Sequence, residues 1–208
     1  MDKATADARV AELARLDAAA VRASMDVAVT VGAADLDRVT PCAGWTVADL
    51  LTHMTAQHEG FAAAAMGDGA DPDRWRPRSW ATAEALVAGY VAASVLVIEA
   101  FAADGIADRA FDLPEISFPG PFPARHGIGF HLVDYVAHGW DLARSLGLDY
   151  DVLDSDVLAA ALVIARTVPE GDHRLGPNAA FAPRVEATTA APLAQTLARL
   201  GRSPDWPS

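Results

Sequence analysis

Residues 129–145, GFHLVDYVAHGWDLARS, place four ionisable side chains on a helix that is otherwise almost entirely apolar. A helix that is apolar around most of its circumference is normally buried. His131, Asp134, His138 and Asp141 are spaced three, four and three residues apart, so at about 100° per residue they form one narrow stripe. Because burying an ionisable group costs free energy unless it is hydrogen-bonded or bound to something, the segment predicts a buried polar site.

The composition indicates one globular domain of 208 residues, of which 52% are hydrophobic. A formal net charge of −12 argues against nucleic acid and anionic membranes as partners, since both attract basic surfaces. No uninterrupted apolar run reaches the roughly 18–20 residues of a membrane span. The single cysteine, Cys42, excludes an internal disulfide and is typical of a reducing compartment, so we expect a cytoplasmic protein.

Hydrophobic periodicity predicts four long helices, a short fifth helix and a terminal helix. Thr46 and Asp49 resemble a capping box at the start of the second long helix. Short alternating pieces between prolines predict a small hairpin within residues 109–122, and residues 184–188 read as a short strand. The expected helices span residues 5–31, 46–67, 79–103, 125–147, 154–166 and 190–200.

These elements predict an all-α fold, a four-helix bundle that carries a short extra helix, the small hairpin and a small C-terminal appendage. We expect residues 1–166 to form a metal-binding bundle domain. Residues 167–208 are expected to pack on that bundle without forming an independent domain. Bundles of this kind place their sites in the core, between side chains of facing helices.

A metal site is one use for the polar stripe. Asp134 and His138 lie four residues apart, so both can reach one ion, whereas His131 and His138 are separated by roughly 10 Å along the helix axis and cannot. The helix therefore offers Asp134 with either His138 or His131. A third ligand must come from another helix, and the second helix offers His53 first and His58 second. Two histidines and one carboxylate leave coordination positions open for water or substrate.

The same residues have a purely structural reading, because Asp-x3-His is common by chance and a lone histidine is more often a satisfied core residue. In that reading Asp134 bonds His53 or His138, and no metal binds. Asp141 is expected to accept a local hydrogen bond. His58 is expected either to face the core or to lie beside the site. His131 is expected to lie beside the site, where it would orient a ligand or line the pocket entrance.

The sequence supplies no obvious catalytic nucleophile. Cys42 lies before the Thr46 cap of the second helix, about two helical turns, or roughly 10 Å, from His53. We expect it to be a packed structural thiol beside Trp45. Nucleophile-elbow, phosphate-loop and dinucleotide-binding glycine motifs are missing from the sequence. Catalytic residues therefore remain unassigned.

Three segments carry a resemblance to a known family: TPCAGWTVADLLTHM (residues 40–54), DYVAHGWDLARSLG (134–147) and LARLGRSPDW (197–206). Together they resemble actinobacterial proteins related to the N-terminal domain of mycothiol-dependent maleylpyruvate isomerase, within the DinB-like superfamily. The resemblance covers nearly the whole chain and implies a DinB-like four-helix bundle that holds one divalent metal.

The resemblance implies a specific ligand set of His53, Asp134 and His138. The family's histidine in its Leu-Leu-x-His run falls on His53, and its Glu-x3-His pair falls on Asp134 and His138. This chain departs from the family by having Asp, one methylene shorter, in place of Glu. The shorter reach could change the metal, weaken its binding or bring His131 or His58 into the site.

By resemblance, the metal holds the thiolate of a low-molecular-weight thiol such as mycothiol, which attacks an electrophile. We therefore expect a metal-dependent thiol transferase or isomerase of small molecules, with zinc as the first candidate ion and nickel as the second. The expected partners are a small electrophile and the thiol, for a monomer or homodimer that binds neither nucleic acid nor membrane. The alternative is a non-catalytic metal-binding bundle with a stress or partner-binding role. Arg125, Arg184 and Arg199 could meet a substrate carboxylate, and the sequence selects none of them.

Overall fold

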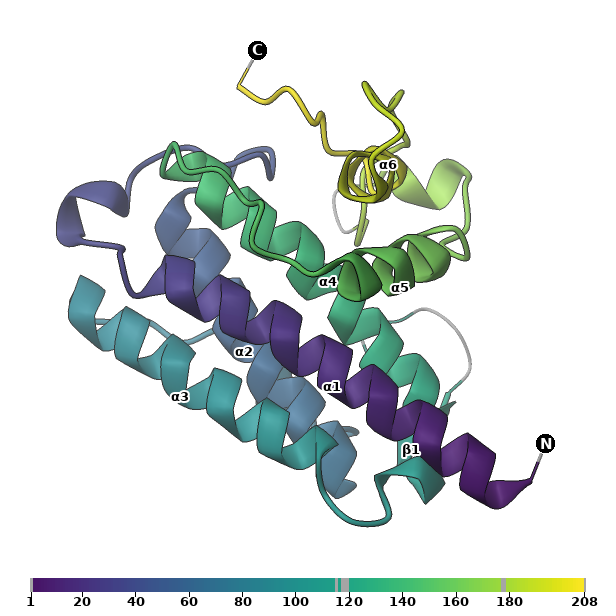
Figure 1. The fold of residues 1–208 in the computed structure, drawn as a ribbon. Coiled ribbons are helices and arrows are strands. Elements are labelled where there is room, and N and C mark those ends of the chain that lie inside the picture. The colour runs from purple at the N-terminus through teal and green to yellow at the C-terminus, as the bar shows by residue number, and fades with distance from the viewer. Residues whose placement is uncertain (1, 115, 117–119, 177–178, 208) are drawn as a thin grey trace.

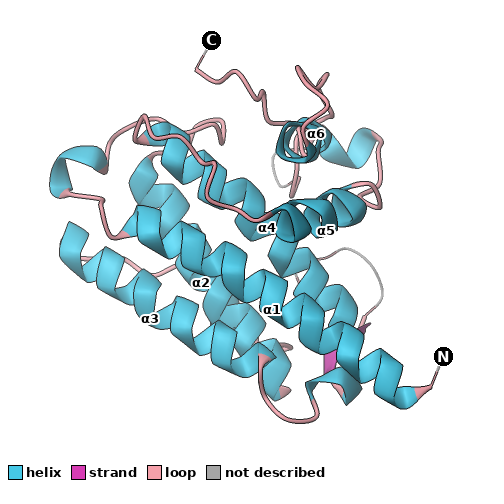
Figure 2. Ribbon diagram, in the orientation of Figure 1, coloured by secondary structure: helices cyan, strands magenta, loops and turns pink. Residues whose placement is uncertain are grey.

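The computed structural model describes residues 2–114, 116, 120–176 and 179–207, and its core is a bundle of four long helices (Figures 1 and 2). The first helix, α1, packs along α4 and α3, and α2 packs along α3 and α4. The predicted all-α bundle is therefore confirmed, with helix ends within a few residues of those expected. The long helices are α1 (Lys3–Ala28), α2 (Val47–Met66), α3 (Ala83–Phe101) and α4 (Ala124–Ser145).

Shorter elements connect and extend the bundle. Of the two additional helices, α5 packs against the sides of α4 and α1, and α6 packs against α5 on the outside of the bundle (Figure 1). They span Ser155–Ala165 and Pro192–Arg199. Single-turn helices η1 to η4 cover Ala33–Asp35, Pro72–Trp75, Ile106–Asp108 and Asp172–Arg174.

The start of α2 follows from its capping residues. Thr46 accepts a hydrogen bond from the Asp49 backbone N–H at 3.3 Å, and the Asp49 carboxylate accepts one from the Thr46 N–H at 2.9 Å. This reciprocal pair is the predicted capping box, and it satisfies two N–H groups that the helix cannot bond internally. The helix ends at Gly67, whose φ of 90° lies in the left-handed region that glycine adopts without steric penalty.

The apolar residues of α4 are buried as predicted. Leu132, Tyr135 and Leu142 have no exposed surface. At Gly139 the helix passes so close to Tyr150 that a Cβ atom would overlap the tyrosine hydroxyl. The absence of a side chain there lets the segment after α4 fold back onto the helix.

The predicted hairpin is present, and the predicted strand at residues 184–188 is wrong. Strand β1 (Ala110–Phe111) pairs antiparallel with β2 (Phe122–Pro123), and residues 115 and 117–119 of the connection lie outside the described residues. Residues 184–188 are all described and form no strand. They run beside α6, where the Val185 N–H donates to the Ala198 carbonyl at 2.9 Å, and a helix offers no ladder of partners to a strand.

Helix α3 is unusually apolar for a helix that is only partly buried. It is long and apolar enough by composition to cross a membrane, with a mean hydropathy of 1.7, and 39% of that window is buried. It does not contain an uninterrupted apolar run of the length considered in the sequence analysis, because Glu84 and Glu99 lie near its ends. In the bundle its inner face packs through Tyr90 and Val97, both fully buried, as expected of a core helix.

Two buried arginines hold the segment after α5 in place, one within the segment itself and one against α4. Arg174 is 4% exposed and donates to backbone carbonyls at Pro169 and Arg199. Arg202 is 8% exposed and reaches α4. A further link joins the Arg144 guanidinium on α4 to the Trp206 carbonyl at 2.9 Å. The C-terminal segment is thereby brought to the ionisable residues of α4.

Candidate metal centre

Three predicted ligands converge between α2 and α4. His53 comes from α2, and Asp134 and His138 come from adjacent turns of α4; each offers a ligand atom within 4.8 Å of the others. The His138 Nε2 atom lies 3.5 Å from Asp134 Oδ1, and the rings of His53 and His138 meet edge to face at 5.4 Å between centroids. The structure thus brings together the set that the family resemblance implies.

Asp141 determines how the His138 ring is oriented. The His138 Nδ1–H donates to Asp141 Oδ2 at 2.9 Å, and Asp141 is fully buried. The expected local hydrogen bond of Asp141 is confirmed. A carboxylate on one ring nitrogen fixes the proton there and leaves the other nitrogen as the metal ligand. Here that other nitrogen is Nε2, which faces Asp134.

Sequence reasoning missed Arg202 as a neighbour of this cluster. Its guanidinium donates to Asp141 Oδ2 from Nε at 3.3 Å and from Nη2 at 3.1 Å. Arg202 lies in the LARLGRSPDW segment, so the resemblance contained the signal. Nothing in spacing along the chain relates residue 202 to residue 141, so the sequence alone offers Arg125, Arg184 and Arg199 and gives no reason to add Arg202.

The expectation that Cys42 lies away from the site is wrong. Its Sγ atom is 3.2 Å from Asp141 Oδ2 and 3.9 Å from His138 Nδ1. The loop before α2 folds back on itself, with the Thr40 N–H bonded to the Trp45 carbonyl at 3.1 Å, and this turn brings the thiol toward α4. Distance counted along a helix axis could not anticipate a loop that reverses direction.

Cys42, Asp141 and His138 form a second group whose ligand atoms lie within 4.8 Å of one another. The positive charge of Arg202 already occupies this side of His138, 3.7 Å from Cys42 Sγ and hydrogen-bonded to Asp141. A metal cation at this position would be repelled by the guanidinium. Electrostatics therefore favour the side of His138 that faces His53 and Asp134.

The two histidines of the cluster have opposite protonation tendencies. Burial, reinforced by the charges of His138 and Arg202, lowers the pKa of His53 to about 4, so that its imidazole is neutral and free to bind a metal. Burial also opposes charge on His138, but Asp134, Asp141 and Cys42 outweigh it and raise the pKa of His138 to about 10. Without a metal, His138 is thus an imidazolium beside two carboxylates, a place where the structure already favours a cation.

His58 and His131 belong to a different network in the core. His131 Nδ1 is 2.7 Å from Asp17 Oδ1, and His131 Nε2 is 3.0 Å from His58 Nδ1. All three residues are fully buried, and Tyr135 stacks on His58 at 3.9 Å between ring centroids. The structure thus shows the core-facing alternative for His58. His131 lies in the same core network, hydrogen-bonded to Asp17 and His58, and not at the entrance of the metal cluster where it was expected. The missed partner, Asp17, left one signal in the sequence, an acid on the apolar face of the first helix.

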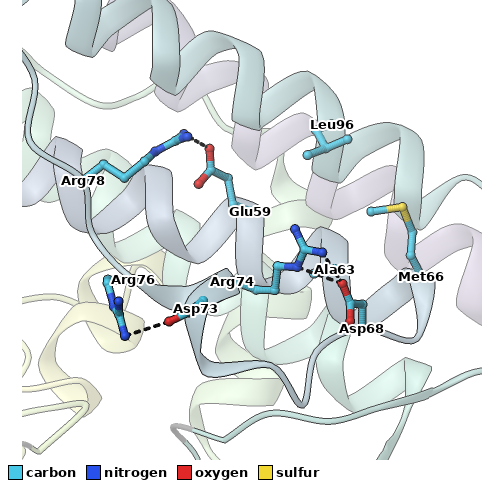
Figure 3. Close-up of a pocket in the computed structure, with 9 residues that line it drawn as sticks. All are labelled: Glu59, Ala63, Met66, Asp68, Asp73, Arg74, Arg76, Arg78 and Leu96. Carbon is cyan, nitrogen blue, oxygen red and sulfur yellow. Dashed lines mark hydrogen bonds and ion pairs between the residues drawn. The ribbon is translucent and has the colours of Figure 1, made fainter.

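A surface groove of about 750 Å³ lies on the α2–α3 face, apart from the histidine cluster (Figure 3). Its lining includes the exposed apolar side chains of Met66 and Leu96. Its rim carries three arginines, each paired with an acid: Arg78 with Glu59, Arg74 with Asp68, and Arg76 with Asp73. None of the residues that line this groove belongs to the metal cluster.

Comparison with known proteins agrees with the sequence segments noted above. Residues 18–143 match the family described as the mycothiol maleylpyruvate isomerase N-terminal domain. Proteins described as uncharacterized from two strains of Mycobacterium tuberculosis are each 33% identical over 177 residues, covering 83% of this chain and 88% of the relative. No solved structure matches this chain. The family match includes His53, Asp134 and His138 and ends before Arg202.

Proposed function

Since the chain belongs to the family of the mycothiol maleylpyruvate isomerase N-terminal domain, we propose that it is a divalent-metal-dependent thiol transferase or isomerase of small molecules. The observation that carries the proposal is the convergence of His53, Asp134 and His138 within 4.8 Å. Zinc is the first candidate ion and nickel the second. The proposed co-substrate is a low-molecular-weight thiol of the mycothiol type, in the cytoplasm, where such thiols are kept reduced.

The donor set suits a divalent cation. His53 is neutral because its pKa is lowered to about 4. The hydrogen bond from His138 Nδ1 to Asp141 makes Nε2 the nitrogen that would give up its proton to bind the ion. Asp134 supplies the negative charge. When bound, a divalent ion with an open coordination position lowers the pKa of a thiol that reaches it, so that thiolate forms at neutral pH.

The surrounding residues shape access to the cluster. The indole of Trp45 packs against His53 at 4.8 Å between ring centroids and forms an apolar wall. His53 and Asp134 are partly exposed, whereas His138 is buried. A small molecule can therefore approach from the side of His53 and Asp134. On the opposite side, Asp141 fixes the His138 ring through the hydrogen bond to Nδ1.

Metal content of tag-free protein tests the first half of the proposal. We expect close to one zinc or nickel per chain by elemental mass spectrometry, and loss of that metal in His138→Ala. His126→Ala is the matched control, because His126 lies on the same helix, is exposed and is expected to leave the metal content unchanged. Parent protein that stays metal-free after incubation with either ion would contradict the proposal.

Thiol-dependent turnover tests the second half. Metal-loaded protein is mixed with mycothiol and a panel of small electrophiles, and thioether conjugates or isomerised products are measured by mass spectrometry. We expect turnover that requires both the thiol and the metal and that disappears in His138→Ala. Metal binding without any turnover across the panel would contradict the enzymatic reading.

One observation favours a second candidate, a non-catalytic metal-binding bundle with a stress or partner-binding role. The groove of Figure 3 is lined by residues outside the metal cluster, so the described surface hollow and the proposed metal do not coincide. In this reading the ion stabilises the packing of α2 on α4. The turnover assay separates the two candidates, because the non-catalytic protein binds metal with no thiol chemistry.

A further inference from the structure

The buried side chain of Arg202 connects the C-terminal segment to Asp141, the hydrogen-bond partner of His138. After α6 ends at Arg199, the chain turns at Gly201, where φ is 78° and a Cβ would lie 2.6 Å from Ala182. This turn directs Arg202 inward, where Nη1 donates to the Leu200 carbonyl at 3.0 Å. The remaining guanidinium nitrogens Nε and Nη2 are left for Asp141.

Arg202 and His138 share one acceptor atom. Asp141 Oδ2 accepts from Arg202 Nη2 at 3.1 Å and from His138 Nδ1 at 2.9 Å. Arg202 also donates to the same oxygen from Nε at 3.3 Å. Two guanidinium N–H groups therefore hold this oxygen in place as the acceptor of the imidazole N–H.

We propose that Arg202 is a positioning residue of the metal centre, which holds the Asp141 carboxylate as the acceptor of the His138 Nδ1–H and thereby directs His138 Nε2 toward the metal. The inference rests on the proposed metal-binding function and extends it. It assigns part of the centre to the C-terminal segment, outside residues 18–143 that match the family. Arg202 is not one of the three proposed ligands and acts through its hydrogen bonds to Asp141.

Arg174 provides a matched control for this inference. It is also a buried arginine that ties the C-terminal segment together, at 4% exposure. Its described hydrogen bonds go to backbone carbonyls, including those of Pro169 at 2.8 Å and Arg199 at 2.6 Å. Arg174→Gln therefore loosens the segment without removing a donor from Asp141.

Zinc affinity is measured by competition with a chromophoric chelator for the parent, R202Q, D141N, the double variant and R174Q. Substitution of residues that orient metal ligands typically weakens binding about 10- to 100-fold, and we expect R202Q and D141N to fall in that range. If Arg202 acts through Asp141, the double variant binds no more weakly than D141N. R174Q is expected to stay within about twofold of the parent. The inference would be overturned if the fold-loss of zinc affinity in the double variant equalled the product of the two single losses. It would also be overturned if R174Q lost as much zinc affinity as R202Q.

A metal-free readout separates this inference from the proposed function. In nitrogen-15 NMR spectra of the apo protein, the His138 Nδ1–H signal reports its hydrogen bond to Asp141. We expect this signal to shift in R202Q, to be recovered in part in R202K and to be unchanged in R174Q. A parent that binds no zinc refutes the proposed function. An unchanged His138 signal in folded R202Q refutes the positioning role, whether or not zinc binds.

Discussion

Replacing His58 tests the buried network of Asp17, His131 and His58 through the pH dependence of stability. His58 has no exposed surface, and its Nε2 has no hydrogen-bond partner among the described residues. Burial, reinforced by the charge of His131, lowers the pKa of His58 well below 6.5. The folded protein therefore keeps His58 neutral at pH values where the unfolded chain protonates it.

The sign and size of the effect follow from proton linkage. A group whose folded pKa is lowered contributes stability that is present above the unfolded pKa and is lost as the pH falls through and below it. With an unfolded pKa of about 6.5, lowering the pH from about 7.5 to about 5.5 stabilises the unfolded state by about RT ln(11/1.1), or about 1.4 kcal/mol. His58→Gln removes this contribution. Between pH of about 7.5 and about 5.5, the free energy of unfolding should therefore fall by about 1.4 kcal/mol more in the parent than in His58→Gln.

Urea unfolding at the two pH values, followed by circular dichroism, measures the difference directly. His58→Gln is expected to be less stable than the parent at both pH values, because it disturbs the contact between His58 Nδ1 and His131. The readout is the change with pH, which that general loss does not affect. His126→Gln, on the exposed surface of α4, is the control. Partial burial and the charge of Arg125 also lower the pKa of His126, but His126 is exposed, so this variant should change the pH dependence less than His58→Gln does. An equal loss of stability with pH in the parent and in His58→Gln would refute the buried neutral state.

Three further predictions concern the metal cluster and the bundle. Asp134→Ala should weaken zinc binding at least about tenfold in a chelator competition. Removing a direct ligand should lower the zinc affinity by at least as much as removing a residue that only orients a ligand. Gly139→Ala should lower the free energy of unfolding in urea by about 1–3 kcal/mol, because the new methyl group overlaps the Tyr150 hydroxyl, whereas Gly32→Ala, where the methyl group has room, should have a much smaller effect. Thr46→Ala should cost about 1 kcal/mol in the same assay through loss of the α2 cap, and no measurable loss would contradict the role of the capping box.

The fold could be predicted because its signals are local. Helical periodicity depends on neighbours three and four residues apart, and the Thr46–Asp49 capping box is contained within one turn. Proximity between Asp134 and His138 follows from the same geometry. The strand expected at residues 184–188 failed because alternation describes a strand only when a partner edge is available.

The surroundings of His138 could not be predicted because they depend on long-range folding. Cys42 reaches the site through a loop that reverses before α2, and Arg202 reaches it through a turn at Gly201. Nothing in the spacing of these residues relates them to Asp141. The family resemblance contained both residues in its quoted segments and gave no indication of their contact.

The ionisable residues of α4 form one continuous stripe in the sequence, but in the structure they belong to two separate groups of interacting residues. At one end His131 is hydrogen-bonded on both ring nitrogens, to Asp17 and His58, so its burial requires no metal. At the other end the described polar contact of Asp134 is a 3.5 Å approach to His138 Nε2, longer than a good hydrogen bond. The free-energy cost of polar groups beside the core is thus offset by hydrogen bonds at His131 and is left only partly offset at Asp134. A cation between Asp134, His138 and His53 would complete the compensation, which is the physical reason to look for the metal at that end of the helix.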